Sequence, residues 1–150
     1  MNEKYSSIPD TKEHIGIVIQ KLTTMALQLI DRAQNHDKSK LEEPELSVFD
    51  EVTPRLKNLT YGSPEYKESL NEMGVALSHH YIMNRHHPEH FENGIKDMNL
   101  IDKIEMIADW KAAVQRHDDG DINKSMEINR IRFNISDYDM AILRAILEVV

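Results

Sequence analysis

The sequence of 150 residues contains no cysteine. Disulfide bonds, thiolate zinc sites and cysteine nucleophiles are therefore excluded, and a chain of this length can bury a core without them. Long apolar runs are also missing, since no segment approaches the roughly 20 residues that cross a bilayer. The first ten residues, MNEKYSSIPD, lack the apolar stretch of a signal peptide. We expect a cytoplasmic protein with no membrane partner, as the reducing cytoplasm suits a chain without thiols.

Basic residues are few as well. The chain has 18 lysines and arginines against 26 acidic residues, which gives a net charge of −8. Proteins that bind long nucleic acid normally present a basic face, and no run of this sequence supplies one. Long nucleic acid is therefore not an expected partner. Small anionic substrates stay open, because bound metal cations can reverse the local sign of the field.

Strand-like alternation is absent, and apolar residues recur at three- and four-residue spacing almost throughout. This pattern predicts a single compact all-α domain over residues 1–150, a bundle of about six helices, with residues 1–11 loosely ordered. Pro44 and Pro54 bracket one short helix, Ser63 and Ser136 can cap two others, and Asp121 or Asn123 can begin another. The expected helices cover residues 12–34, 46–52, 64 to the first histidine pair, 100–116, 121 or 123 to 131, and 136 to the C-terminus.

Histidine, by contrast, is abundant and clustered. The chain has eight histidines, and two of its segments are HDKSK, which begins at His36, and HHYIMNRHHPEH, which begins at His79. Neutral imidazole and carboxylate are ligands for Zn, Mn, Fe and similar divalent ions. The pairing of His36 with Asp37 and the second cluster therefore predict a metal site with a catalytic role. Lys40 is suited to hold a substrate phosphate beside such a site, although it could equally be a solvated lysine.

The second cluster allows several arrangements. If its helix persists, His80 and His87 share one stripe and His79 and His86 share the next. Positions seven apart lie roughly 10 Å apart along a helix, so one ion cannot take both, whereas two ions, or an ion and a substrate anion, could. Alternatively, one histidine of each pair is core and the other is at the surface. His90 lies beyond Pro88 and is expected at the surface.

Asp109 is the third element of the expected site. It lies between Ala108 and Trp110 in an apolar stretch, so partial burial is expected, and a buried carboxylate needs a cation or hydrogen-bond donors. Asp102 and Glu105 continue the same acidic stripe, and Asp102 is expected in solvent. His117 is expected at the surface.

His14 poses a geometric question. It precedes His36 by 22 positions, and one continuous helix would separate the two by roughly 33 Å. Either the chain reverses near Thr23 and Thr24, or His14 is not a ligand.

The order His14, His36-Asp37, later histidines and Asp109 resembles the HD-domain superfamily of metal-dependent phosphohydrolases. HDKSK is similar to a form of that motif in which the lysine faces substrate phosphate. HDKSK, TPRLK…TYGSPEY, HHYIMNRHHPEH and NLIDKIEMIADWKAA together resemble a family of small HD-like proteins from phages and bacteria, over residues 14 to about 133. The resemblance implies an all-helical fold and a divalent metal centre, and it raises His14 as a ligand.

The resemblance implies a hydrolase that attacks a nucleotide or a small phosphorylated metabolite with a metal-activated water. Its first ion (Mn, Fe, Zn, Co, Ni or Mg) would bind His14, His36, Asp37 and Asp109, while His80 and His87 would hold a second ion or the phosphate. Substrate contacts would come from Lys40, Arg85, His86 and His79. Asp37 and Lys40 would be catalytic. Arg85 could also be a surface residue. Superfamily relatives are often dimers, so a homodimer is compatible with the resemblance.

One departure from the superfamily bears on catalysis. Its deoxynucleotide phosphatases carry a catalytic glutamate where this chain has Lys40, so Glu43 or Glu45 would have to substitute for it, unless the metal-activated water acts alone. Two other functions stay open: an HD-type di-iron oxygenase, and a non-catalytic phage protein that sequesters a nucleotide.

Overall fold

The structure is a computed structural model that describes residues 5–60, 62–116 and 120–150. It divides into two units, residues 1–35 and 36–150. The described residues form seven α-helices and no strand, which confirms the all-α prediction. The sequence predicted about six helices. The additional one arises because the helix expected there is interrupted between Glu72 and Gly74, where Gly74 begins the next helix with a φ of 44°.

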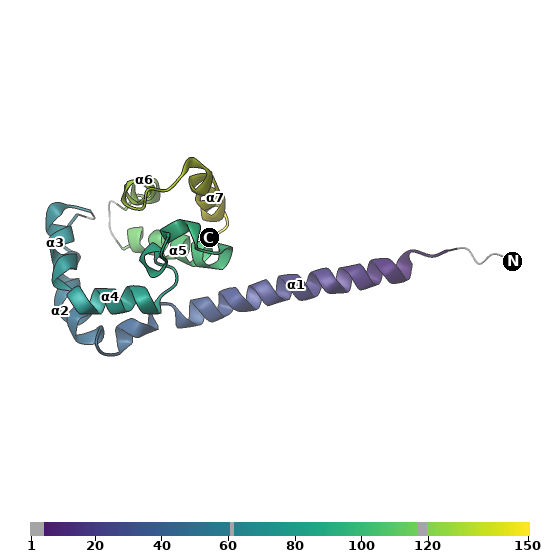
Figure 1. Ribbon diagram of the computed structural model, residues 1–150, viewed down its shortest axis with the longest axis horizontal. Helices are drawn as coiled ribbons and strands as arrows, with labels where there is room; N and C mark the ends of the chain where they lie inside the picture. The colour runs from purple at the N-terminus through teal and green to yellow at the C-terminus, as the bar shows by residue number, and fades with distance from the viewer. Residues whose placement is uncertain (1–4, 61, 117–119) are drawn as a thin grey trace. The chain divides into compact units, whose positions relative to one another are not determined.

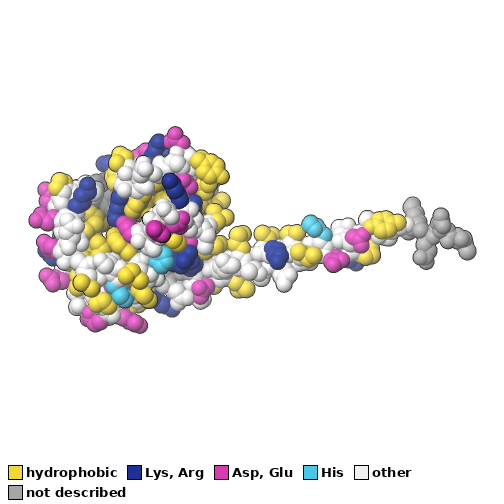
Figure 2. Space-filling model, viewed as in Figure 1, with side chains coloured by type: hydrophobic (Ala, Val, Ile, Leu, Met, Phe, Trp, Pro, Cys, Tyr) yellow, Lys and Arg dark blue, Asp and Glu magenta, His cyan; other side chains and the backbone are white. Residues whose placement is uncertain are grey.

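The first unit contains one helix, α1 (Ile8–Asn35). It begins four residues before the expected start at residue 12, so residues 8–11 are helical; residues 1–4 lie outside the described part of the chain. The helix is continuous through Thr23 and Thr24, so the reversal considered at that point does not form. No described side chain of α1 is buried, and hydrophobic side chains follow its length (Figure 2).

The second unit contains the remaining helices (Figure 1). Serine caps act as predicted, since the hydroxyls of Ser63 and Ser136 accept hydrogen bonds from the amides of Tyr66 and Asp139, each at 3.1 Å. The α-helices are α2 (Leu46–Leu56), α3 (Pro64–Glu72), α4 (Gly74–Met83), α5 (Leu100–Val114), α6 (Ile122–Arg132) and α7 (Asp137–Leu147). Three short 3₁₀ helices are η1 (Lys38–Leu41), η2 (Pro88–His90) and η3 (Gly94–Lys96).

One other expectation about helix limits is wrong. Pro54 lies inside α2 and does not end it. The helix that carries the first histidine pair ends at Met83, because Asn84 has an extended backbone with φ −119° and ψ 107°. His86 and His87 therefore lie in a turn after α4, and the spacing expected for a persisting helix does not apply.

The core of the second unit lies where α5 packs against α6 and α7. Methionine is prominent in it: Met98, Met106, Met126 and Met140 are all at most 4% exposed. Flexible thioether side chains fill irregular gaps between helices. No described helix is both long and apolar enough to cross a bilayer.

Candidate metal centre

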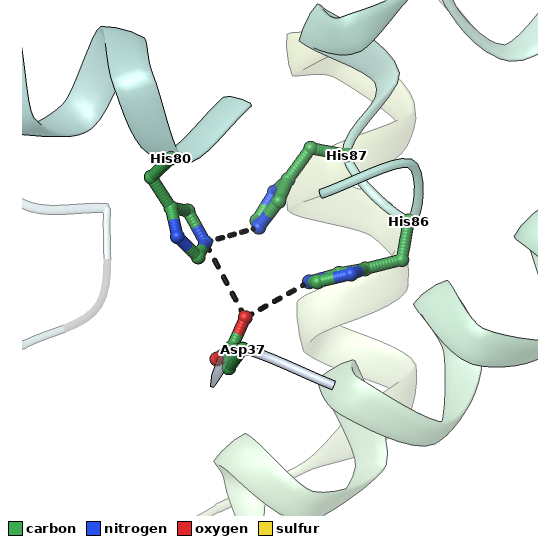
Figure 3. Close-up of side chains that lie close together, drawn as sticks. All are labelled: Asp37, His80, His86 and His87. Atoms are coloured by element: carbon green, nitrogen blue, oxygen red, sulfur yellow. Dashed lines mark hydrogen bonds and ion pairs between the residues drawn. The ribbon is translucent and has the colours of Figure 1, made fainter. Parts of the chain in front are cut away.

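Asp37 occupies a turn at the start of the second unit. Its backbone is left-handed, with a φ of 55°, and the 3₁₀ helix η1 begins at the next residue. Among non-glycine residues, asparagine and aspartate adopt this conformation most readily. The turn directs the carboxylate toward the end of α4 and the turn that follows it (Figure 3).

Three histidines surround this carboxylate. One ligand atom from each of Asp37, His80, His86 and His87 lies within 4.8 Å of the others. Asp37 Oδ1 is 3.4 Å from His80 Nε2 and 3.5 Å from His86 Nε2, while the Nε2 atoms of His80 and His87 are 2.8 Å apart (Figure 3). Ligands held about 2.1 Å from one tetrahedral ion are separated by about 3.4 Å. The two distances to Asp37 match that value, and the two imidazoles need to separate by about half an ångström.

Two atoms that lie close together in this group are buried without a hydrogen bond, and so is His86 Nδ1 on the other side of its ring. Among the described residues, neither Asp37 Oδ1 nor His86 Nε2 has a hydrogen-bond partner. Leaving a buried polar atom unpaired costs about 1–3 kcal/mol, so native structures rarely keep one without a reason. Both atoms face the same point, and an ion there would satisfy both. This observation marks the group as a candidate metal centre.

A second group lies beside the first and shares Asp37. His36, Asp37 and Asp109 also offer ligand atoms within 4.8 Å of one another, with His36 Nε2 at 3.7 Å from Asp37 Oδ2 and 3.6 Å from Asp109 Oδ1. A carboxylate that offers one oxygen to each group can bridge two ions. The first group is rich in nitrogen and the second in oxygen, so they favour different ions.

Two glutamates approach the outer nitrogens of the ligand imidazoles. Glu105 Oε1 is 3.0 Å from His36 Nδ1 and 3.2 Å from His86 Nδ1, and it also forms a third compact group with these two histidines. Glu45 lies 2.8 Å from His80 Nδ1. Carboxylates hydrogen-bonded in this way orient the imidazoles of His36 and His80 and direct their other nitrogens toward a metal, whereas His86 Nδ1 forms no hydrogen bond to Glu105.

The shifted pKa values of His80, His87 and Asp37 favour the protonation states in which these groups can bind a metal ion. Burial, together with His86 and His80, lowers the pKa of His87 to about 2, so this imidazole is neutral. Burial and the nearby Lys40 ammonium also lower the pKa of His80. Although burial alone would raise the pKa of Asp37, the Lys40 ammonium brings it below its ordinary value. His36 differs, because the carboxylates of Asp109 and Glu105 raise its pKa to about 10.

The residues expected to contact substrate lie in different surroundings. Lys40 Nζ is 2.6 Å from Asp37 Oδ2 and therefore borders the centre. Arg85 binds Asp102 through two hydrogen bonds, of 3.1 and 3.0 Å. His79 Nδ1 lies 2.7 Å from Glu45 Oε1, within hydrogen-bond distance.

Other predicted residues fall outside the compact groups of the second unit. His14 is exposed on α1, and the prediction that it is a ligand stays a prediction. His90 is half-buried, with Nδ1 at 3.0 Å from the carbonyl oxygen of Tyr81, and it belongs to none of the compact groups among the described residues. The expectation that Asp102 is solvated is wrong, because Asp102 is fully buried. His117 lies outside the described residues.

Sequence reasoning gave Glu105 no place in the site and considered Glu45 only as a catalytic base. Glu105 precedes Asp109 by one helical turn of α5, a spacing that puts both on one face and could have indicated it. Glu45 gave no comparable signal, because its position depends on how the segment after η1 turns into α2.

The fold and the cluster together define an all-helical protein with a buried group of histidines and an aspartate that could hold a metal ion. The chain belongs to a family of unknown function, DUF5662, whose model matches residues 3–149. Comparisons with curated proteins and with solved structures gave no match.

Proposed function

We propose that the protein is a metal-dependent phosphohydrolase of the HD type, acting on a nucleotide or another small phosphorylated metabolite. The proposal depends on one observation: Asp37 Oδ1 and His86 Nε2 are buried, unpaired and directed at a common point beside two further imidazoles. A divalent ion at that point would lower the pKa of a water molecule and offset charge that develops on phosphorus. The resemblance of HDKSK to the HD motif supports the same class.

The residues of the chain have separate parts in the proposed reaction. The imidazoles of His80, His86 and His87 and the carboxylate of Asp37 form the cage. Lys40 lies against Asp37 Oδ2, with its side chain about one-third exposed, so its ammonium can turn to an incoming phosphate. Glu45 is not free to act as the base, because it is fully buried against two histidines. Glu43 is exposed, accepts a hydrogen bond from Ser47 and belongs to none of the compact ligand groups among the described residues, so we assign it no part in the reaction.

The test is a phosphate-release screen across nucleotides and small phosphate esters, run separately with Mn, Fe, Zn, Co, Ni and Mg. We expect release with at least one metal and none from Asp37→Asn. Lys40→Met should raise KM more than it lowers kcat if the ammonium binds phosphate. Lys38→Met, which removes a neighbouring lysine, is the matched control. Metal bound tightly with no phosphate released from any substrate would overturn the proposal.

The sharing of Asp37 between two ligand groups favours one alternative, an oxygenase with two irons. Two irons per chain by elemental analysis, together with oxygen consumption, would assign that function. Tight nucleotide binding with no product under any metal would instead assign the sequestering function.

A further inference from the structure

Glu45 is a carboxylate with no exposed surface, placed between two consecutive histidines. Its Oε1 lies 2.7 Å from His79 Nδ1 and its Oε2 lies 2.8 Å from His80 Nδ1. The hydroxyl of Ser39 donates a third hydrogen bond to Oε2, at 3.1 Å. Each carboxylate oxygen is therefore engaged by a different imidazole.

The neighbouring donors assign the hydrogen in the contact between Glu45 and His80. Asn84 Nδ2 lies 3.1 Å from His80 Nδ1, but its two hydrogens are donated to the carbonyl oxygen of His80 and to Ser39 Oγ, so none is left for the ring. A carboxylate only accepts hydrogen bonds. The hydrogen between Glu45 Oε2 and His80 therefore resides on His80 Nδ1.

This assignment decides the state of the other nitrogen of the ring. A neutral imidazole carries one hydrogen, so with Nδ1 protonated the Nε2 of His80 holds a lone pair. That lone pair faces the centre, 3.4 Å from Asp37 Oδ1 and 2.8 Å from His87 Nε2, and His87 must be the donor in this contact. Phe49 packs edge-on against the ring, with centroids 5.7 Å apart, and opposes its rotation.

We infer that Glu45 is a positioning residue of the metal centre: it fixes His80 as the tautomer whose Nε2 lone pair faces the ion, and His79 holds the second oxygen of Glu45 in place. The inference rests on the proposed metal centre for its functional consequence, but the tautomer it assigns belongs to the protein without metal. Partners of this kind typically change metal affinity by about 10- to 100-fold.

The discriminating substitution is Glu45→Gln. Glutamine matches glutamate in shape but offers one oxygen acceptor and one amide donor, so it cannot accept from both histidines. The matched control is Glu43→Gln, which removes the same charge two residues away from an exposed side chain. Glu45→Asp keeps the charge with a shorter side chain and should recover part of what glutamine loses.

The first measurement uses the full chain without metal. Long-range ¹H–¹⁵N correlation spectra of the imidazole rings distinguish a protonated Nδ1 from a protonated Nε2. We expect the Nδ1–H tautomer for His80 in the wild type and in Glu43→Gln, and a mixture of tautomers in Glu45→Gln. A wild-type His80 with its hydrogen on Nε2 would overturn the inference, whether or not the protein binds metal.

The second measurement is calorimetric titration with Zn and Co, with the Co absorption spectrum as a signature of ligand geometry. We expect about 10- to 100-fold weaker binding and an altered spectrum for Glu45→Gln, partial recovery for Glu45→Asp and no change for Glu43→Gln. Circular dichroism confirms that each variant is folded. Unchanged affinity and spectrum in a folded Glu45→Gln would overturn the inference alone, while a wild type that binds no metal would overturn it together with the proposed function.

Discussion

The Nε2 atoms of His80 and His87 lie 2.8 Å apart although the two residues are seven positions apart in the chain. A continuous helix would place them roughly 10 Å apart along its axis. The contact forms because α4 ends at Met83 and the chain turns back through Asn84. Asn84 supports this turn, since its side-chain amide donates to the carbonyl oxygen of His80 at 2.9 Å and to Ser39 Oγ at 2.7 Å.

Asp37→Asn should separate the loss of the metal centre from damage to the fold. Asparagine tolerates the left-handed backbone of this position, so we expect the helical content to be unchanged. Asparagine lacks the negative charge that Asp37 offers to both ligand groups, so metal affinity should fall by at least about 100-fold. This loss exceeds the one expected when a residue that only orients a ligand is replaced. Titration calorimetry and circular dichroism measure the two effects. Wild-type metal affinity in this variant would exclude Asp37 as a ligand.

Glu105→Gln should weaken metal binding by about 10- to 100-fold, because the glutamate faces the Nδ1 atoms of both His36 and His86. Its side chain is only 10% exposed, so a test of folding must accompany the titration. Glu92→Gln changes an exposed glutamate and is the control. Equal affinities for the two variants would contradict a supporting part for Glu105.

The stability of the metal-free protein should fall as the pH rises from about 7 to 10. The pKa of His36 is raised from its ordinary 6.5 to about 10 by Asp109 and Glu105, so protonated His36 favours the folded state. This contribution is fully present below pH 6.5 and is lost as the pH rises through 10. Its upper limit is roughly 5 kcal/mol, and urea unfolding at several pH values measures it.

The control for that experiment is His36→Gln, which should show a flatter dependence over the same pH range. The same proton must leave before His36 can bind a metal, so affinity should increase with pH in the wild type. If the unfolding free energy of both proteins depends on pH in the same way, the pKa of His36 is not raised in the folded state.

Arg85→Ala should affect stability more than substrate binding. The sequence suggested a phosphate clamp, but the guanidinium forms two hydrogen bonds to the fully buried Asp102 and lies over the ring of Phe91. Removing it takes two hydrogen bonds from a buried carboxylate, while the capping contacts with Asn99 remain, so we expect a loss of about 2–4 kcal/mol in unfolding free energy. Chemical denaturation checks this value. If the variant has wild-type stability and a strongly raised KM, Arg85 binds substrate phosphate as the sequence suggested.

Local chemistry in the sequence accounts for the helices and for part of the site. Serine, proline and aspartate signals located the starts of α3, α6 and α7, because capping involves residues close together in the chain. His36 and Asp37 were predicted as ligands because they are adjacent, and the structure brings them close to Asp109. Their place as ligands awaits the metal titrations.

The remaining features depend on distant contacts. The end of α4 could not be predicted, because no proline or glycine follows Met83 directly and the turn is held by the contact of Asn84 with Ser39, 45 positions earlier. Burial of Asp102 and Glu45 likewise follows from partners in other elements. Periodicity within one segment carries no information on such pairs.

The methionines of the core connect its packing to oxidation chemistry. A sulfoxide is polar and larger than a thioether, so a single oxidised Met106 or Met126 could not return to its place among the helices. Both side chains are fully enclosed in the folded state, so peroxide can reach them only when α5, α6 and α7 separate. The rate at which sulfoxide accumulates at these two positions would therefore measure how often the second unit opens.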